Sequence, residues 1–165
     1  KLATSTIFNL LGPLTNPANA KRQLLGVFDK RWVNIHCKTL KELGSERAMV
    51  VHGDDGLDEI SLSGVTSISE LKNGIIKEYV FDPKDYGYDY IQNSDIKGGD
   101  PEFNALKFTE MLEGKNKKFQ KIVELNAGAA IYLSDISKDL NEGFKIARNV
   151  IEKKISKNYL NQIIS

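Results

Sequence analysis

The chain has 165 residues, of which 41% are hydrophobic and 27% are charged, so it can bury a core of ordinary size as one globular domain. Its 23 Lys and Arg residues nearly balance its 22 Asp and Glu residues, and the net charge of +1 argues against a nucleic-acid or membrane partner. A single cysteine excludes an internal disulfide and two histidines are too few for a zinc cluster, which fits a reducing, cytoplasmic location.

No apolar run approaches the roughly 20 residues that a membrane span needs, and the first residues lack the pattern of a secretory signal. The sequence opens without Met, directly in helix-forming residues. We therefore expect residues 1–165 to be a single α/β domain, a truncated portion of a larger protein.

The first predicted element is a short helix that ends abruptly. Ser5 or Thr6 can cap it, and Gly12-Pro13 stops it because proline disfavours a helical conformation in the residue before it. A proline-locked loop then follows. Loops of this composition are usually structural turns, so this loop alone does not predict a ligand site.

A strand–helix–strand unit comes next. Residues 23–28 form a continuous apolar run, which predicts a strand covered on both faces, and Asp29 can cap a helix over residues 31–43 that Gly44 terminates. The residues of this helix expected to face inward are Trp32, Ile35, Thr39, Leu40 and Leu43. A second apolar run at residues 47–53 begins the alternation typical of an α/β fold.

The following segment predicts antiparallel pairing. Residues 60–64 alternate apolar and polar side chains. Asn73-Gly74 joins residues 68–72 to residues 75–81 and tolerates the positive φ angles of a type I′ turn. We interpret these residues as an accessory hairpin, followed by an irregular crossing.

The carboxyl-terminal half predicts packed helices over about residues 102–113, 118–133 and 138–156. A last short helix is expected around Leu160. The second of these helices contains the small residues 127–130, which permit close approach of another backbone.

Candidate ligand-binding residues gather after the second predicted strand. Four carboxylates lie there within six residues: Asp54, Asp55, Asp58 and Glu59. In open α/β sheets ligands bind at the carboxyl ends of strands, and oxygen ligands of this kind suit Mg²⁺. Asp58 and Glu59 can converge on a metal only if the backbone turns beside them, since neighbouring side chains on a strand point to opposite faces. An exposed acidic turn without a ligand is the competing interpretation.

Other candidate residues have structural explanations that we favour. The turn at residues 98–100 could bind phosphate, but Asp100 is better explained as the N-cap of a helix with the following proline in its first position. His36 and Cys37 are expected to be packing residues. His52, at the end of a strand, could support the acidic loop but is more simply a histidine whose hydrogen bonds are satisfied there.

Several blocks together resemble anthranilate phosphoribosyltransferases. Residues 6–18 (TIFNLLGPLTNPA) look like the hallmark of that family, and residues 55–61 (DGLDEIS) match a second specific block. Four shorter blocks match in the family's order and spacing: residues 23–28, 50–53, 98–100 and 125–127. The resemblance therefore covers essentially the whole chain.

The resemblance implies transfer of the 5-phosphoribosyl group from phosphoribosyl diphosphate to the amine of anthranilate, with release of diphosphate, in tryptophan biosynthesis. It implies a mixed, largely parallel central sheet flanked by helices, as in the carboxyl-terminal domain of nucleoside phosphorylases and phosphoribosyltransferases. By position, Asp58 and Glu59 match the acidic pair that binds Mg²⁺, and the metal in turn holds the diphosphate. Gly12 and Pro13 match the loop that lines the anthranilate tunnel, and no residue of this chain is assigned as catalytic.

Parts of the family's site are not found in this sequence. Its glycine-rich diphosphate loop, its Lys-His-Gly-Asn segment, its anthranilate-binding arginine and its helical domain would all precede Lys1, and Ala3 and Ser5 stand where the family usually has glycine and arginine. We therefore expect residues 1–165 alone to lack transferase activity and to self-associate through apolar surface. The resemblance also implies a homodimeric parent, and fusion to or association with a glutamine amidotransferase stays open.

Three other functions stay open. A pyrimidine nucleoside phosphorylase shares the fold and a related Gly-Pro loop, although Asp58-Glu59 and Thr15-Asn16 favour the transferase. A nucleic-acid-binding relative of the same fold would need a basic surface, which the net charge of +1 argues against. The third possible function is that of a folded domain with a structural role and no catalytic activity.

Overall fold

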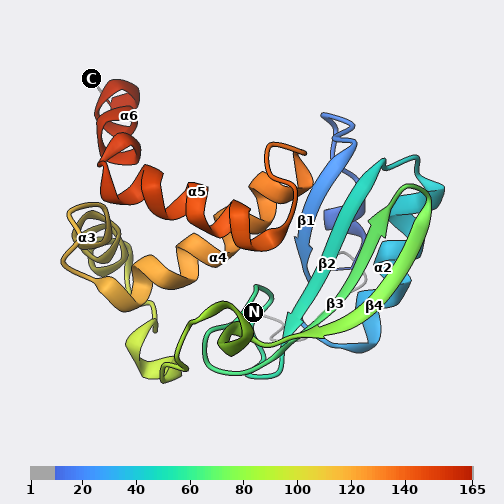
Figure 1. Ribbon diagram of the computed structural model, residues 1–165, viewed down its shortest axis with the longest axis horizontal. Coiled ribbons are helices and arrows are strands. Elements are labelled where there is room, and N and C mark those ends of the chain that lie inside the picture. Colours follow the sequence, from blue (N-terminus) through green and yellow to red (C-terminus); the bar gives the residue numbers. More distant parts are fainter. Residues whose placement is uncertain (1–9, 165) are drawn as a thin grey trace.

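The structure, a computed structural model, describes residues 10–164 (Figure 1). The predicted cap of the first helix, Ser5 or Thr6, lies outside this range. The described elements are η1 (Gly12–Leu14), β1 (Arg22–Gly26), α2 (Arg31–Glu42), β2 (Arg47–Gly53), β3 (Thr66–Lys72), β4 (Ile75–Phe81), η2 (Pro83–Tyr86), η3 (Asn93–Asp95), α3 (Pro101–Leu112), α4 (Lys117–Leu133), α5 (Leu140–Glu152) and α6 (Ile155–Ile164). Among these residues no helix is both long enough and apolar enough to cross a membrane.

The strands form one sheet in the order β1-β2-β3-β4. Strands β1 and β2 run parallel and are connected by α2, whereas β3 pairs antiparallel with both β2 and β4. The expected α/β class and mixed sheet are confirmed. Two of the three pairings between the described strands are antiparallel, so this part of the sheet is less parallel than the resemblance implied.

The β3–β4 hairpin is antiparallel, as expected, and it continues the main sheet. Its turn has the predicted conformation, since Asn73 and Gly74 have φ angles of 52° and 74°. Residues 60–64 do not form a strand. Their alternation was misleading because Ser61 is as fully buried as the apolar residues on either side of it.

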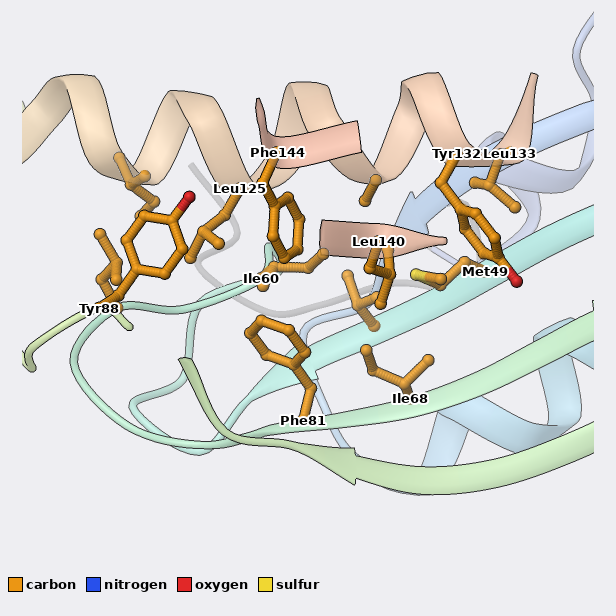
Figure 2. Close-up of a cluster of buried hydrophobic side chains, with 14 residues drawn as sticks. Met49, Ile60, Ile68, Phe81, Tyr88, Leu125, Tyr132, Leu133, Leu140 and Phe144 are labelled. Carbon is orange, nitrogen blue, oxygen red and sulfur yellow. The ribbon is translucent and has the colours of Figure 1, made fainter. Parts of the chain in front are cut away.

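Two hydrophobic cores flank the sheet, and β2 contributes to both. Met49 and Val51 face the core formed with α4 and α5, whereas Ala48 and Val50 face the core formed with α2. This double coverage explains the continuous apolar run of β2. Figure 2 shows the larger core, in which the ring of Phe144 points from α5 toward the sheet.

Helix α2 lies on the sheet with a face that agrees only in part with the one predicted, since Leu40 is buried and Trp32 packs against the core as expected. Its buried residues, Val33, His36, Cys37 and Leu40, have the spacing of one helical stripe. Ile35 and Leu43 are 50% and 55% exposed, so their predicted inward orientation was wrong. The buried face of the helix was partly misjudged because a polar histidine, His36, occupies the centre of the buried stripe. The helix begins at the predicted residue and Gly44, with a φ of 83°, ends it as expected. The N-cap position is Lys30, and Asp29, one residue earlier, accepts a hydrogen bond from the Arg31 amide at 2.9 Å.

The carboxyl-terminal helices form a layer over the sheet and an extension beside it. Helices α4 and α5 cover one face, while α3 and α6 lie farther from the strands (Figure 1). Helix α5 is shorter than predicted because Lys154 adopts a φ of 57°, which separates it from α6. The expected close approach at residues 127–130 is confirmed. A Cβ on Gly128 would lie 2.7 Å from the Phe144 backbone nitrogen.

Candidate functional site

The acidic loop lies where the parallel strands end. Strand β2 stops at Gly53, and the loop folds back so that the Gly53 amide donates to the Leu57 carbonyl at 2.8 Å. The loop then packs directly on the end of β1, because a Cβ added to Gly26 would lie 1.5 Å from the Asp58 carbonyl oxygen. Only glycine fits at this contact. Two sheet strands thus place Asp58 at their carboxyl edge, the location at which α/β sheets bind ligands.

The four carboxylates of the loop do not act as one cluster. Asp55 turns inward, where its Oδ2 accepts from Ser61 Oγ at 2.7 Å and its Oδ1 accepts from the Leu57 amide at 3.3 Å. The side chain of Asp54 is exposed. Across residues 10–164 no group of three or more His, Cys, Asp or Glu side chains could hold a metal ion. What remains for a ligand is the pair Asp58 and Glu59.

Asp58 and Glu59 line a cavity of about 410 Å³ between the sheet and α4. Its other walls are formed by Leu24, Gly26, Val51, Phe119, Ile122, Val123, Asn126 and Ala127. Most of these side chains are apolar. The two carboxylates therefore lie at the edge of a hollow with largely apolar walls.

The two carboxylates carry uncompensated negative charge. Both side chains are exposed at the rim of the cavity, and within the described residues neither forms an ion pair. Partial loss of hydration, and then the adjacent Asp58 charge, raise the pKa of Glu59 above its ordinary value. Two neighbouring carboxylates fit Mg²⁺, which is usually bound by one or two carboxylates together with water and substrate phosphates. The donor set suits a metal shared with a ligand rather than one enclosed by protein.

His52 stands beside this loop but is engaged with the sheet. Its Nδ1 lies 2.8 Å from the Val27 carbonyl oxygen, which can only accept, so the ring proton is on Nδ1. The ring thereby ties the end of β2 to the residue after β1. This bond agrees with the expectation of a satisfied histidine at a strand end.

The Gly12-Pro13 loop lies against α2 and does not reach the same cavity. Gly12 is exposed and Pro13 is half-buried, within η1. The turn before them is held by His36, whose Nε2 lies 3.0 Å from the Leu10 carbonyl oxygen. His36 and Cys37 are both buried in the core under α2, as expected. Among residues 10–164, Gly12 and Pro13 are thus not brought together with Asp58 and Glu59 in that cavity.

The Gly-Gly-Asp turn is a helix cap. Asp100 accepts from the Phe103 amide at 2.8 Å, and the amide of Gly99 donates to Asn104 Oδ1 at 2.8 Å. Two amides of this turn are thus hydrogen-bonded within the protein, which favours the helix-cap interpretation over a phosphate site. The N-cap interpretation of Asp100 is confirmed.

Sequence reasoning included Asn126 in the matched block of residues 125–127 but assigned it no role in the site. Asn126 on α4 lines the cavity and hydrogen-bonds to the backbone of Ile60, next to Glu59. A polar residue among the apolar positions of a buried helix was the available signal. Its partner lies 66 positions away, and no local pattern reports such a contact.

Comparison with known proteins identifies similar chains. Residues 1–154 match the family description "Glycosyl transferase family, a/b domain". The chain is 46% identical over 164 residues to the anthranilate phosphoribosyltransferase of Alkaliphilus metalliredigens, a match that covers 99% of this chain and 48% of that protein. The chain therefore spans about half the length of this relative.

Solved structures of the same name share the fold. The crystal structure of the enzyme from Thermus thermophilus superposes with a TM-score of 0.88 at 37% identity, over 98% of this chain and 47% of that one. Structures from Saccharomyces cerevisiae in complex with PRPP and Mg, and with 4-fluoroanthranilate, give TM-scores of 0.82 and 0.84 at 28% and 25% identity. They cover 97% of this chain and 46% and 47% of theirs.

Proposed function

Starting from the fact that this chain belongs to the glycosyl transferase family through its a/b domain, we propose that it forms part of an anthranilate phosphoribosyltransferase. In this proposal residues 1–165 are one α/β domain of a larger enzyme. The observation that carries it is the Asp58–Glu59 pair, which forms no ion pair within residues 10–164, at the edge of a largely apolar cavity and at the carboxyl ends of β1 and β2. The similarity to enzymes of this name over nearly the whole chain supports the assignment.

The proposed reaction exchanges one bond to the ribose for another. The bond from ribose C1 to the diphosphate oxygen breaks, a bond from C1 to the anthranilate nitrogen forms, and the amine loses a proton. Mg²⁺, when bound, stabilises the negative charge that grows on the departing diphosphate. Asp58 and Glu59 would hold that metal. The yeast relative solved in complex with PRPP and Mg supports the use of Mg²⁺ in the reaction.

The remaining residues of the chain would position and shield the reactants. The amine of anthranilate is already a nucleophile, so correct placement supplies much of the remaining rate enhancement. Gly12 and Pro13 would form a rigid wall for the flat aromatic ring, and the apolar walls contributed by α4 would exclude water from the departing group. No catalytic acid or base is assigned within this chain.

The setting of the enzyme follows from the same assignment. We infer a cytoplasmic, homodimeric enzyme of tryptophan biosynthesis, without a nucleic-acid or membrane partner. The buried, unpaired Cys37 supports a reducing compartment. Fusion to or association with a glutamine amidotransferase stays open.

Joining the chain to the rest of a relative tests the function directly. Residues 1–165 would be made alone, and also fused to the part of the Alkaliphilus metalliredigens enzyme that the match leaves uncovered. With Mg²⁺ and phosphoribosyl diphosphate, we expect the fused protein to consume anthranilate, measured by its fluorescence, and to rescue a tryptophan auxotroph. We expect no turnover by residues 1–165 alone. Phosphorolysis of a pyrimidine nucleoside by the fused protein, without anthranilate turnover, would favour the phosphorylase instead.

The metal role is tested by removing one charge at a time. Asp58→Asn and Glu59→Gln should each weaken Mg²⁺ activation of the fused protein at least tenfold, because each removes one oxygen anion from the pair. Asp54→Asn is the matched control, since that side chain is exposed and lies outside the cavity lining. Equal effects of all three substitutions would contradict the assignment of Asp58 and Glu59.

A further inference from the structure

We propose that Asn126 is a positioning residue for the Asp58–Glu59 pair, an inference that rests on the proposed function of that pair. The side chain of Asn126 meets the backbone of Ile60, the residue that follows Glu59. Its Oδ1 accepts from the Ile60 amide at 2.9 Å, and its Nδ2 donates to the Ile60 carbonyl oxygen at 3.0 Å. The carboxamide therefore pairs with Ile60 much as an adjacent strand would.

The orientation of this carboxamide is fixed by its own helix. Its Nδ2 also donates to the Ile122 carbonyl oxygen at 3.0 Å, one turn earlier on α4. Ile60 is fully buried, so water cannot take the place of Asn126 at its amide and carbonyl. These hydrogen bonds consequently hold the end of the acidic loop in a fixed position against α4.

The acidic pair is held from two sides by this arrangement. At Asp58 the loop backbone is in close contact with Gly26 of β1, and at Ile60 it is hydrogen-bonded to Asn126 of α4. Asn126 lines the same cavity as the two carboxylates. A segment fixed at both ends holds its side chains in one place, which is what a metal site with only two protein ligands requires.

A general stabilising role of Asn126 in α4 must be separated from this positioning role. Asn116 offers a matched comparison, because it also supports α4, by accepting from the Phe119 amide at 3.1 Å. Its removal weakens the helix start without changing a contact to the acidic loop. Both asparagines can be replaced by alanine in the intact protein.

The experiment measures loop anchoring and metal binding in the same samples. Hydrogen exchange of the Ile60 amide reports anchoring, and paramagnetic broadening of the Asp58 and Glu59 amide signals by added Mn²⁺ reports affinity. We expect Asn126→Ala to lose Ile60 protection and to bind Mn²⁺ about 10- to 100-fold more weakly, the usual effect of losing a group that orients metal ligands. Asn116→Ala should lower Tm and leave both readouts unchanged.

A longer side chain provides a second variant if Asn126→Ala does not fold. Asn126→Gln keeps the carboxamide and has a higher helix propensity, but its extra methylene displaces the hydrogen-bonding atoms, so both readouts should fall. A folded Asn126 variant that loses Ile60 protection yet binds Mn²⁺ like the unaltered protein would overturn the proposal. Equal losses of Mn²⁺ affinity in the Asn116 and Asn126 variants would do the same.

Failure of the proposed function gives a different result. If the unaltered protein shows no broadening at Asp58 and Glu59, the metal role of the pair is wrong. Ile60 exchange in Asn126→Ala still decides whether Asn126 anchors the loop, and unchanged protection there contradicts the anchoring itself.

Discussion

At the scale of single residues, two uncharged groups decide where the charged ones lie. Gly26 allows the Asp58 carbonyl to approach β1, and Asn126 binds the backbone at Ile60. Asp55 contributes as well, since its carboxylate accepts from Ser61 and the Leu57 amide instead of facing a ligand. Contacts of Gly26, Asn126 and Asp55, rather than contacts of the two carboxylates themselves, therefore set the geometry of the acidic pair.

Replacement of Gly26 by alanine tests the first of these contacts. A methyl group 1.5 Å from a backbone oxygen cannot be accommodated by rotating a side chain, so the loop has to move. We expect a loss of about 1–3 kcal/mol in the free energy of unfolding, typical of overpacking, together with weaker Mn²⁺ binding. Gly64→Ala is the control, since an added Cβ there has no atom within 4 Å. Denaturant titration should separate the two variants, and equal stability of both would contradict the close contact.

Part of the site could be predicted from local sequence and part could not. The acidic pair follows an apolar run that ends in glycine, which located it at the carboxyl edge of a strand. The pairing of Asp55 with Ser61 and that of Asn126 with Ile60 depend on how the chain returns in space. Such contacts have no periodicity, so residue type alone could not show that the Asp55 carboxylate turns inward to Ser61.

At the scale of elements, two glycines allow α4 and α5 to pack closely against each other. Gly128 and Gly143 face each other there, and a Cβ on Gly143 would lie 2.3 Å from the Gly128 carbonyl oxygen. Hydrogen bonds around the buried Glu124 also join these helices to the crossing after β4. Arg148 Nε donates to Glu124 Oε1 at 2.8 Å, and Tyr88 Oη donates to the same carboxylate oxygen. The pKa of Tyr88 is raised by its burial and by this carboxylate.

Gly128→Ala tests whether sterics or helix propensity dominates at the crossing. Alanine in place of glycine would stabilise an exposed helix position by about 1 kcal/mol. Here the added methyl would meet the backbone of Phe144, and the resulting overpacking should cost about 1–3 kcal/mol. We expect a net loss of stability in thermal unfolding, whereas an increase in Tm would show that the helices can separate at little cost.

At the scale of the whole molecule, the chain consists of a sheet-centred body and a helical extension. The alternation of strands and helices was enough to predict the α/β class. It did not predict that β3 and β4 extend the same sheet. The order of strands depends on pairing between distant segments, and the residue pattern within one strand does not determine its neighbours. The extension contains α3 and α6, which meet through a small core of Met111, Leu112, Ile151 and their neighbours.

Acid should loosen this extension through one carboxylate. Glu113, just after α3, pairs with Lys115 at 2.7 Å and with Lys157 of α6 at 2.9 Å, and these bonds lower its pKa from 4.5 to about 2. A pKa below the unfolded value means that the stabilisation is complete above pH 4.5 and disappears as the pH falls toward 2. Amide exchange in α6 should therefore accelerate across that range.

Glu113→Gln provides the comparison that isolates this group from the other carboxylates, because it removes the charge while keeping the shape. The variant should show faster exchange in α6 already at pH 6 and a smaller further change on acidification. The pairing with Lys157 then accounts for the difference between the two proteins, since both retain the apolar contacts of Leu160. Parallel exchange profiles for the two proteins from pH 6 to pH 2 would mean that α6 is held by those apolar contacts alone.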